Sequence, residues 1–286
     1  MFSDKTALRI RWRLKFGSRL NIENPQTLNE KIQWLKLYDH NPAYSQMVDK
    51  YEAKFYVAGI IGEEHIIPTL GIYDSFEEID FSQLPKQFVL KATHDCGSII
   101  ICRDKVTFDI NAARKKLSGR LKTSFYLRKR LYLYKNIKPR IIAEEYMESE
   151  ENSLTHSLTH SLTHSLTDYK FFCFGGEPKI VLVATDRING PWFDIYDMDF
   201  VHLPFTRGKP NAKEPPKRPS CFDEMIETAK KLSKNIPFVR VDLYEINGKV
   251  FFGELTFYPA AGFSVVKPHE WDYTLGSWLT LPEKRP

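Results

Sequence analysis

Two acidic residues stand among apolar neighbours in the segment VRVDLYEINGKVFFGELTFYPAAGF. Asn247-Gly248 is a turn signal, so the segment predicts a β-hairpin with Asp242 on its first strand and Glu254 on its second. An acid within an apolar strand is costly to bury unless it is paired or bound to a metal. These two acids therefore require a cation.

The register of this hairpin decides whether both acids can hold the same cation. A two-residue turn would pair Asp242 with Gly253 and send Glu254 to the opposite face. A three-residue loop, with Gly248 as a left-handed bulge, would place five alternating residues on one face. These are Arg240, Asp242, Phe252, Glu254 and Thr256. We predict the three-residue loop, because a shared Mg²⁺ requires one face.

Two further segments carry residues that suit a nucleotide. In FVLKATHDCGSIII, Lys91 supplies a point charge for phosphate, and the turn with Gly97 and Ser98 supplies close backbone N–H groups. A plain hairpin with an exposed lysine accounts for this segment equally well. In RIIAEEYMESEE, backbone groups of residues 145–147 could meet an adenine, although by itself a strand that ends in a solvated acidic loop is the better reading.

The elements that must position these residues read as a mixture of helices and strands. NPQTLNEKIQWLKLYD has capping-box spacing between Thr27 and Glu30, and VDKYEAKFYVAGIIG predicts a second helix that ends near Gly62. Short apolar strands follow from Pro68 onward, interrupted by a helical pattern over residues 110–130 and another in EMIETAKKLSKN. The class is mixed α and β with antiparallel hairpins. FTRGKPNAKEPPKRPS predicts a proline-rich surface loop.

Composition supports a folded chain and excludes several classes. The 286 residues are 42% hydrophobic, and no stretch approaches eighteen apolar residues, so we expect a cytosolic protein without signal peptide or membrane span. The cysteines show no metal-site spacing and predict reduced, structural thiols. They are Cys96, Cys102, Cys173 and Cys221.

The net charge of +5 is unevenly distributed. Basic residues crowd the first 19 positions and residues 114–138, where solvated helix faces are the ordinary explanation. The sharper hypothesis is attraction to an acidic glycan, a phosphate-linked lipid carrier or the inner membrane surface. Nucleic acid is not expected as a partner, because no recognised binding motif accompanies these residues.

The segment SLTHSLTHSLTHSLT, residues 153–167, repeats a four-residue unit without error. A perfect short repeat is poorly suited to a packed core, so we predict a tolerated loop. The histidines at 156, 160 and 164 could share a helix face and bind a metal, but no acid or cysteine completes a cage. The tetranucleotide TCAC, read continuously in threes, encodes this repeat. Slippage in such a tract would shift the frame, so we hypothesise phase variation.

The order of these motifs resembles the ATP-grasp superfamily, and more closely its TupA-like family of polysaccharide biosynthesis, over about residues 20–270. The matching segments are NPQTLNEKIQW, DKYEAKFYV, FVLKATHDCGS, PRIIAEEY, DYKFFCF and the closing hairpin. The resemblance implies an α+β ATP-grasp fold, two α/β lobes clamping ATP behind a helical N-terminal lead-in. We accordingly predict a helical segment over residues 1–66, a small lobe over 67–147, the repeat loop over 148–167 and a large lobe over 168–286.

The resemblance also implies roles for individual residues. Lys91 and Lys50 would contact ATP phosphates, helped by the turn that contains His94, Gly97 and Ser98. Glu144, Glu145 and Met147 would form the adenine hinge, with Asp168 or an acid among residues 148–151 near the ribose. The catalytic cations facing phosphate or the reacting carboxylate would be Lys170, Arg187 and Arg240, and Mg²⁺ would be held by Asp242, Glu254 and Thr256.

Two positions depart from the family pattern. Most ATP-grasp enzymes have asparagine where this chain has Thr256, which still offers an oxygen but leaves the second-metal position open. Lys54 stands where we expect arginine, so the charge is kept without a bidentate fork.

The resemblance implies a carboxylate–amine ligase that uses ATP and Mg²⁺ and forms an amide through an acyl phosphate. The expected substrates are an anionic glycan or lipid-linked glycan precursor, of a surface polysaccharide or lipopolysaccharide, and a small amine or amino acid. The alternatives are a glycosyltransferase and a non-catalytic scaffold. A glycosyltransferase would need a D-x-D motif for its sugar nucleotide. The sequence DMD at residues 197–199 has these letters, but it lies in a loop-like aromatic setting and is not a convincing motif.

Overall fold

The structure is a computed structural model that describes residues 3–148, 166–186 and 190–285. The chain divides into two compact units. Unit 1 combines Met1–Asn41 with Glu148–Pro286, and unit 2 is Pro42–Met147. The division differs from the expected boundary between residues 66 and 67. The reason is visible at Lys54, whose ammonium group donates to the Ile67 carbonyl and to Thr69 and thereby ties the preceding helix to the strands of unit 2.

Unit 2 is built on a four-stranded antiparallel sheet in the order β1-β4-β2-β3. Its strands are β1 (Thr69–Tyr73), β2 (Phe88–Ala92), β3 (Ile100–Cys102) and β4 (Ile141–Glu145). Its helices are α3 (Ala43–Val48), α4 (Glu52–Ile61), α5 (Ile110–Leu121) and α6 (Phe125–Lys129), with short 3-10 turns η1 (Glu63–His65), η2 (Phe76–Glu78) and η3 (Tyr132–Tyr134). The helical pattern over residues 110–130 is thus two helices.

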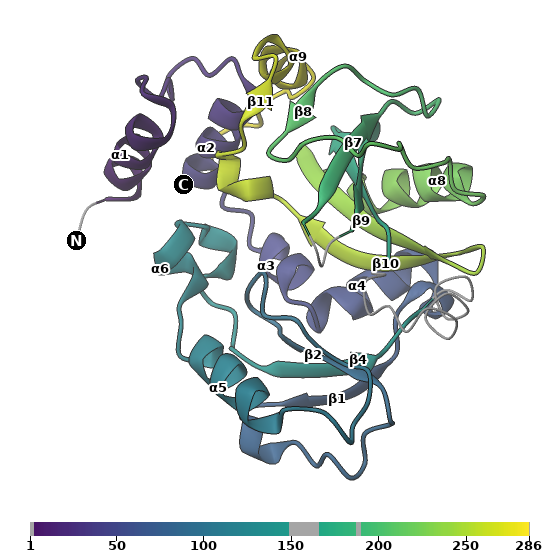
Figure 1. The fold of residues 1–286 in the computed structure, drawn as a ribbon. Coiled ribbons are helices and arrows are strands. Elements are labelled where there is room, and N and C mark those ends of the chain that lie inside the picture. Colours follow the sequence, from purple (N-terminus) through teal and green to yellow (C-terminus); the bar gives the residue numbers. More distant parts are fainter. Residues whose placement is uncertain (1–2, 149–165, 187–189, 286) are drawn as a thin grey trace. The chain divides into compact units, whose positions relative to one another are not determined.

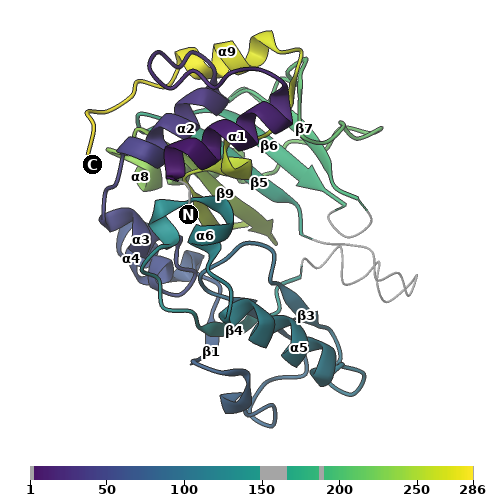
Figure 2. The same ribbon diagram turned by 90° about the vertical axis from the view of Figure 1, so that its left-hand side faces the viewer.

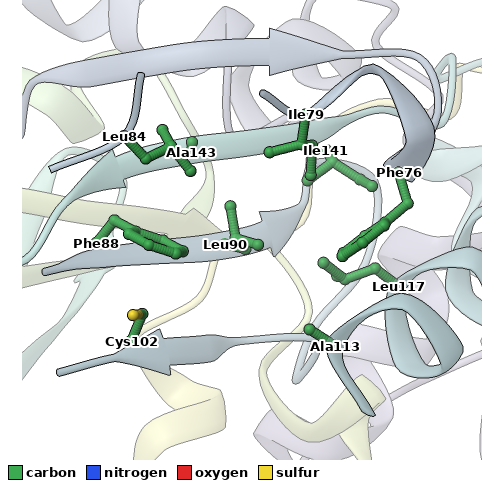
Figure 3. Close-up of a cluster of buried hydrophobic side chains, with 10 residues drawn as sticks. All are labelled: Phe76, Ile79, Leu84, Phe88, Leu90, Cys102, Ala113, Leu117, Ile141 and Ala143. Atoms are coloured by element: carbon green, nitrogen blue, oxygen red, sulfur yellow. The ribbon is translucent and has the colours of Figure 1, made fainter. Parts of the chain in front are cut away.

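The core of unit 2 lies between its sheet and α5 (Figure 3). Alternate residues of β2, Phe88 and Leu90, are fully buried there against Ile141 and Ala143 of β4. Leu117 of α5 and the ring of Phe76 close the cluster from the helical side. Alternation along β2 therefore leaves Lys91 on the opposite face of this sheet.

Unit 1 contains a five-stranded antiparallel sheet in the order β10-β9-β5-β6-β7 and a two-stranded ribbon of β8 and β11. The strands are β5 (Asp168–Phe174), β6 (Glu177–Thr185), β7 (Trp192–Tyr196), β8 (Thr206–Arg207), β9 (Phe238–Ile246), β10 (Lys249–Thr256) and β11 (Val266–Lys267). Helix α8 (Phe222–Ser233) covers one face of the large sheet (Figure 1), where the rings of Phe171 and Phe222 lie 5.7 Å apart. The side chains that alternate with Phe171 on β5 project from the other face.

The N-terminal helices also belong to unit 1. Helix α2 (Leu28–Tyr38) contacts both α1 (Asp4–Phe16) and α9 (Glu270–Ser277), as Figure 2 shows, and η4 (Pro259–Gly262) contacts α2 as well. The predicted capping box of Thr27 and Glu30 is confirmed. Asn29 fastens α2 to α9 by donating from its amide to the Asp272 carboxylate over 2.7 Å.

Several smaller expectations can be compared with the structure. Helix α4 ends at Ile61 with Gly62 as its cap, as predicted. The four cysteines are free thiols. No helix in the described ranges is long and apolar enough to cross a membrane. The prediction of a surface loop over residues 205–220 is wrong at its start, because β8 pairs with β11 there and buries Arg207.

Candidate functional site

The acids of the closing hairpin face cations on neighbouring strands of the unit 1 sheet. In the sheet register, Lys170 of β5 pairs with Asp242 of β9, and Asp242 pairs with Glu254 of β10. In the adjacent row, Arg240 pairs with Thr256. Directly paired side chains project from the same face of a sheet. One face of the sheet, opposite to the face that α8 covers, therefore gathers Lys170, Arg240, Asp242, Glu254 and Thr256.

Short ion pairs link these residues. The Lys170 ammonium lies 2.5 Å from the Asp168 carboxylate and 2.6 Å from that of Asp242. Arg240 donates to both oxygens of Asp242 in a fork, with Nε and Nη2 each 2.6 Å from their acceptors. Its Nη2 atom also reaches Glu254 at 3.1 Å. The cluster thus holds three carboxylates and two cations.

The Thr256 hydroxyl completes this arrangement. It donates to Glu254 Oε1 over 2.9 Å and accepts from Arg240 over 3.0 Å. Thr256 therefore places an oxygen beside the Glu254 carboxylate, at the position where the family pattern has asparagine.

The predicted three-residue loop is wrong. Lys249 pairs with Ile246, so Asn247 and Gly248 form a two-residue turn with positive φ at both positions. The extra residue lies instead at Gly253, where the register shifts between Phe252 and Glu254. This β-bulge restores the pairing of the two acids. It also moves Phe252 off their face, because Phe252 pairs with Leu243.

The electrostatics of this cluster favour additional positive charge. Burial alone would lower the pKa of Arg240, but the carboxylates of Asp242 and Glu254 raise it above the ordinary arginine value. Burial raises the pKa of Asp242 despite its two cations, and the nearby charges of Asp168 and Glu254 act in the same direction. A further cation near Asp242 would therefore be attracted.

Mg²⁺ fits the chemistry of these donors. Asp242, Glu254 and Thr256 offer two carboxylates and a hydroxyl, and proteins commonly bind Mg²⁺ through one or two carboxylates together with water and substrate phosphates. Within the described ranges, no group of three or more His, Cys, Asp and Glu could hold a metal by itself. Two carboxylates and a hydroxyl suit a metal that arrives with a nucleotide phosphate. The assignment of Mg²⁺ to these residues stays a prediction.

In unit 2, two lysines share one buried glutamate. Glu144 of β4 is 4% exposed, and its carboxylate pairs with Lys91 of β2 and Lys54 of α4. Burial would raise the pKa of Glu144, but the charges of Lys91 and Lys54 outweigh it and lower the pKa. The Glu144 side chain therefore anchors the predicted phosphate lysine to the sheet.

The turn that follows Lys91 is held by its own side chains. Ser98 accepts from the Ala92 N–H at 3.1 Å and donates to Asp95, whose other oxygen lies 3.5 Å from Arg120. Lys50 donates to the Asp95 carbonyl. Both predicted phosphate lysines, Lys50 and Lys91, belong to unit 2. Gly97 has a φ of +87°, a left-handed conformation that favours glycine.

His94 lies in the same turn but is 3% exposed, and its Nε2 lies 3.2 Å from the Arg120 carbonyl. The structure thus places His94, Gly97 and Ser98 in one turn. His94 is buried within that turn, and its ring contacts the backbone carbonyl of Arg120.

The predicted adenine hinge is at the end of β4. The Glu145 N–H donates to the Pro68 carbonyl over 3.1 Å, so this backbone donor is used within the sheet of unit 2. Met147 is the last residue of unit 2 and is partly exposed. The adenine hinge stays a prediction. The Glu144 side chain forms ion pairs with Lys54 and Lys91 and is therefore not placed to contact an adenine.

Several predicted residues lie outside the described ranges: Arg187, the acids at 150 and 151, and the repeat histidines at 156, 160 and 164. Asp168, the other ribose candidate, is buried and paired with Lys170.

The D-x-D letters at residues 197–199 build a turn. The Asp197 carboxylate accepts from the N–H groups of Asp199 and Val201, over 3.0 and 2.8 Å. This local use of the carboxylate gives the motif an ordinary structural role.

One buried cation was missed by the sequence reasoning. Arg207 is 4% exposed and lies with its guanidinium carbon 5.0 Å from the centre of the Phe172 ring. Phe172 pairs with Arg240, so Arg207 stacks on the face that carries the acid cluster. The burial of Arg207 could not be predicted, because it lies in a proline-rich segment and the two residues of β8 are too few to show the alternation of a strand.

Comparison with known proteins gives a family match and several similar solved structures. The chain matches the TupA-like ATPgrasp family over residues 30–280. No curated protein matches the sequence. Among solved structures, D-alanine–D-alanine ligase from Bacillus anthracis complexed with ATP is 12% identical with a TM-score of 0.41, covering 74% of this chain and 54% of its own.

Two other solved structures show similar values. D-Alanine–D-alanine ligase from Helicobacter pylori is 13% identical with a TM-score of 0.41, covering 83% of this chain and 60% of its own. A RimK domain ATP-grasp protein from Sphaerobacter thermophilus is 10% identical with a TM-score of 0.41, covering 83% of this chain and 69% of its own. The chain thus spans 54% and 60% of the length of the two ligases.

The family match covers most of the chain and includes both the closing hairpin and the strands that carry Lys91 and Glu144. This protein belongs to the TupA-like ATPgrasp family and has the α+β ATP-grasp fold.

Proposed function

We propose that this protein is an ATP-dependent carboxylate–amine ligase that modifies a bacterial surface glycan precursor. The observation that carries the proposal is the row of Lys170, Asp242 and Glu254 across three strands, with Arg240 forked onto Asp242. Such a row supplies acids for a metal and cations for transferring phosphate. Family membership supports the ATP-dependent ligase chemistry.

The reaction would need positioning and charge neutralisation rather than a protein nucleophile. A carboxylate oxygen of the substrate takes the terminal phosphoryl group of ATP, with ADP leaving. An amine nitrogen then attacks the carbonyl carbon, and phosphate leaves as the C–O bond breaks. Lys170 and Arg240 would stabilise the charge that develops on the phosphoryl and acyl oxygens.

Other residues would hold the nucleotide and its metal. When bound at Asp242, Glu254 and Thr256, Mg²⁺ would neutralise phosphate charge. Lys91 and Lys50 would bind phosphate oxygens, and the end of β4 would supply the adenine contacts. Glu144 would orient Lys91, because its buried carboxylate forms an ion pair with the Lys91 ammonium group.

The substrate proposal rests on the family's association with polysaccharide biosynthesis. A uronic acid or an amino acid attached to the glycan would supply the carboxylate, and a small amine or amino acid would supply the nitrogen. The net charge of +5 suits an anionic acceptor.

Helix α1 is the proposed contact with the inner membrane surface. It exposes Arg9, Arg13 and Lys15 together with Leu14, which is 83% exposed. Basic residues beside an exposed apolar side chain suit an anionic lipid surface. Sedimentation with phosphatidylglycerol vesicles should fall when the three basic residues are replaced by glutamine, whereas unchanged sedimentation would remove this part of the proposal.

Nucleotide consumption separates the proposed ligase from a glycosyltransferase. Purified protein would be incubated with glycan precursor from cells that lack the gene, an amino acid mixture, ATP and a mixture of sugar nucleotides. The ligase should produce ADP and phosphate only when precursor and amine are both present. Consumption of a sugar nucleotide with ATP untouched would instead support the transferase.

We also propose that the SLTH tract switches the gene. A gain or loss of three tetranucleotide units adds or deletes one SLTH in frame, whereas one or two units shift the frame before Lys170 is encoded. Such a shift would remove the acids of the closing hairpin. Sequencing the tract in sibling colonies tests this proposal: length variants support it, and an invariant tract with mixed codons would refute it.

A further inference from the structure

Arg207 is a buried cation with two side-chain nitrogens that no hydrogen bond of the described residues uses. The residue is 4% exposed, and its Nε and Nη2 atoms have no hydrogen-bond partner in the described part of the chain. Its guanidinium stacks on Phe172. A buried charged group without hydrogen bonds is costly, so this arrangement needs an explanation.

The nearby Asp272 carboxylate offsets the burial of this guanidinium only in part. Burial lowers the pKa of Arg207 to about 10, opposed by Asp272 and assisted by the positive charge of Arg240. Arg207 therefore remains protonated at neutral pH. The Asp272 carboxylate is engaged with Asn29, whose amide donates to one oxygen over 2.7 Å and whose N–H donates to the other over 3.3 Å.

The local fold fixes the position of Arg207. The residue pairs with Val266 across the β8–β11 ribbon, and the next N–H, of Gly208, donates to the Val265 carbonyl over 2.9 Å. Gly208 has a φ of +83°, a left-handed conformation that lets the chain leave the ribbon directly after Arg207. The guanidinium is thus presented from a paired strand rather than from an exposed loop.

The two unused nitrogens have a specific geometry. Nε and Nη2 form one edge of the guanidinium plane, the edge that binds two oxygens of a carboxylate or phosphate side by side. Arg240 uses this same pair of atoms to hold the two oxygens of Asp242. In Arg207 no hydrogen bond of the described residues occupies the corresponding edge.

The stacking partner shows where that ligand would be. Phe172 is the direct cross-strand partner of Arg240, so Arg207 lies over the same face of the sheet as Arg240 and Lys170. Three cations in unit 1 therefore surround the region where the proposed function needs oxyanion binding.

We propose that Arg207 binds the reacting oxyanion of the substrate, a carboxylate or phosphate group, through its Nε–Nη2 edge. That the bound oxyanion is the reacting group of the substrate rests on the proposed ligase function. That Arg207 binds an oxyanion at all rests only on the geometry of unit 1. Arg207 would then stabilise negative charge alongside Arg240 but, unlike Arg240, without a carboxylate of the protein to compete for its fork.

Anion binding by Arg207→Met tests the proposal. Met keeps a long, unbranched apolar side chain beside Phe172 but removes the charge and the fork. Binding of inorganic phosphate to full-length protein would be measured by calorimetry and by the increase in unfolding temperature, because a ligand that binds the native state raises stability. The variant should bind phosphate at least 10-fold more weakly than the original protein, in line with the loss of a charge-assisted bidentate pair.

Arg218→Met is the matched control. Arg218 also lies 5.0 Å from a phenylalanine ring, that of Phe222, but it is exposed and already paired with Asp223 at 2.7 Å. Phosphate binding should be unchanged in this control. If Arg207→Met does not fold, Arg207→Lys serves instead, since it keeps the charge and loses only the fork; its phosphate affinity should also fall.

Titration with acetate distinguishes the two classes of oxyanion. The ion whose binding depends on Arg207 identifies the group that this residue recognises. Phosphate and acetate binding that both persist unchanged in Arg207→Met, or that are absent from the original protein, would overturn the proposal.

Binding of MgADP separates this result from the proposed function. MgADP affinity should be the same in the original protein and in Arg207→Met. Failure of the original protein to bind MgADP would contradict the ligase proposal, while the phosphate comparison would still decide whether Arg207 is an anion-binding residue.

Discussion

At the residue scale, charge is unequally balanced in the unit 1 cluster. The carboxylates of Asp168, Asp242 and Glu254 share the two cations Lys170 and Arg240. Within these five residues the carboxylates outnumber the cations by one, beside the Thr256 hydroxyl. Carboxylate and hydroxyl oxygens of this kind suit a divalent cation that arrives together with an anionic nucleotide.

Replacing Asp242 by asparagine should abolish most of the ATP-dependent activity. The change removes a metal ligand and the acceptor of the Arg240 fork, so we expect turnover to fall by about 100-fold to 1,000-fold. The Mg²⁺ concentration for half-maximal activity should rise. Both are measured by phosphate release over a magnesium titration.

Glu245→Gln is the control for that experiment, because Glu245 lies on the same strand and bonds to Ser220 outside the cluster. Its activity should stay near that of the original protein. Full activity of Asp242→Asn at the original magnesium requirement would contradict the metal assignment.

Replacing Glu144 by glutamine should destabilise the protein and alter its response to acid. The change leaves Lys54 and Lys91 without their buried counter-ion, which costs about 3–5 kcal/mol. The pKa of Glu144 is lowered in the native state, so its contribution is present above the ordinary glutamate pKa of about 4.3 and is lost as the pH falls further. Urea unfolding between pH 3 and pH 7 measures both effects.

The original protein should lose more stability on acidification than Glu144→Gln does. Glu145→Gln, an exposed neighbour on the same strand, should behave like the original protein. Equal acid sensitivity of the original protein and Glu144→Gln would show that the ion pairs contribute little.

At the element scale, the closing hairpin contains a bulge at a position where only glycine fits without crowding. A side chain at Gly253 would place its Cβ 2.9 Å from the Tyr244 ring and 3.0 Å from the Asp242 carbonyl oxygen. The bulge brings Glu254 opposite Asp242 despite the two-residue turn. The position of this one glycine therefore determines whether the acids share a face.

Gly253→Ala should impair activity more than stability alone explains. Overpacking at this point costs about 1–3 kcal/mol and should shift Glu254 relative to Asp242. Gly248→Ala is the matched change in the same hairpin: its Cβ meets nothing within 4 Å, and the left-handed φ of +75° costs about 1–2 kcal/mol. Activity measured per folded molecule should fall only for Gly253→Ala. Equal effects would contradict a catalytic role for the bulge.

The sequence predicted part of the geometry of this closing hairpin. The requirement of a shared Mg²⁺ predicted that the two acids lie on one face, and the pairing of Arg240 with Thr256 and of Asp242 with Glu254 confirms that face. The location of the extra residue was not predictable, because the crowding at Gly253 exists only after the strands have paired. Arg207 was hidden for a related reason, since its burial depends on Phe172 and Val266, which lie far away in sequence.

At the scale of the whole molecule, the chain leaves unit 1 after Asn41 and returns at Glu148. Unit 2 is therefore continuous in sequence and contains its own sheet, hydrophobic cluster and ion pairs. The family resemblance predicted the fold. It gave residues 1–66 as one helical segment, whereas the structure divides this segment between the two units, because an amphipathic pattern does not specify which sheet a helix contacts.

Unit 2 should fold when it is produced alone as residues 42–147. A segment with its own core is expected to unfold cooperatively, which circular dichroism during thermal unfolding would show. Leu90→Ala in this fragment should lower its stability by about 2–5 kcal/mol, because Leu90 is fully buried in the cluster. Gradual, non-cooperative melting of the original fragment would show that unit 2 depends on unit 1.

Oxygen transfer from the carboxylate to phosphate tests the central claim most directly. Glycan precursor labelled with ¹⁸O in its carboxylate would be incubated with the protein, Mg²⁺, ATP and an amine, and the phosphate released would be examined by mass spectrometry. Amide formation through an acyl phosphate predicts one ¹⁸O atom in each phosphate formed. A modified glycan whose formation releases unlabelled phosphate, or leaves ATP unspent, would contradict the ligase mechanism.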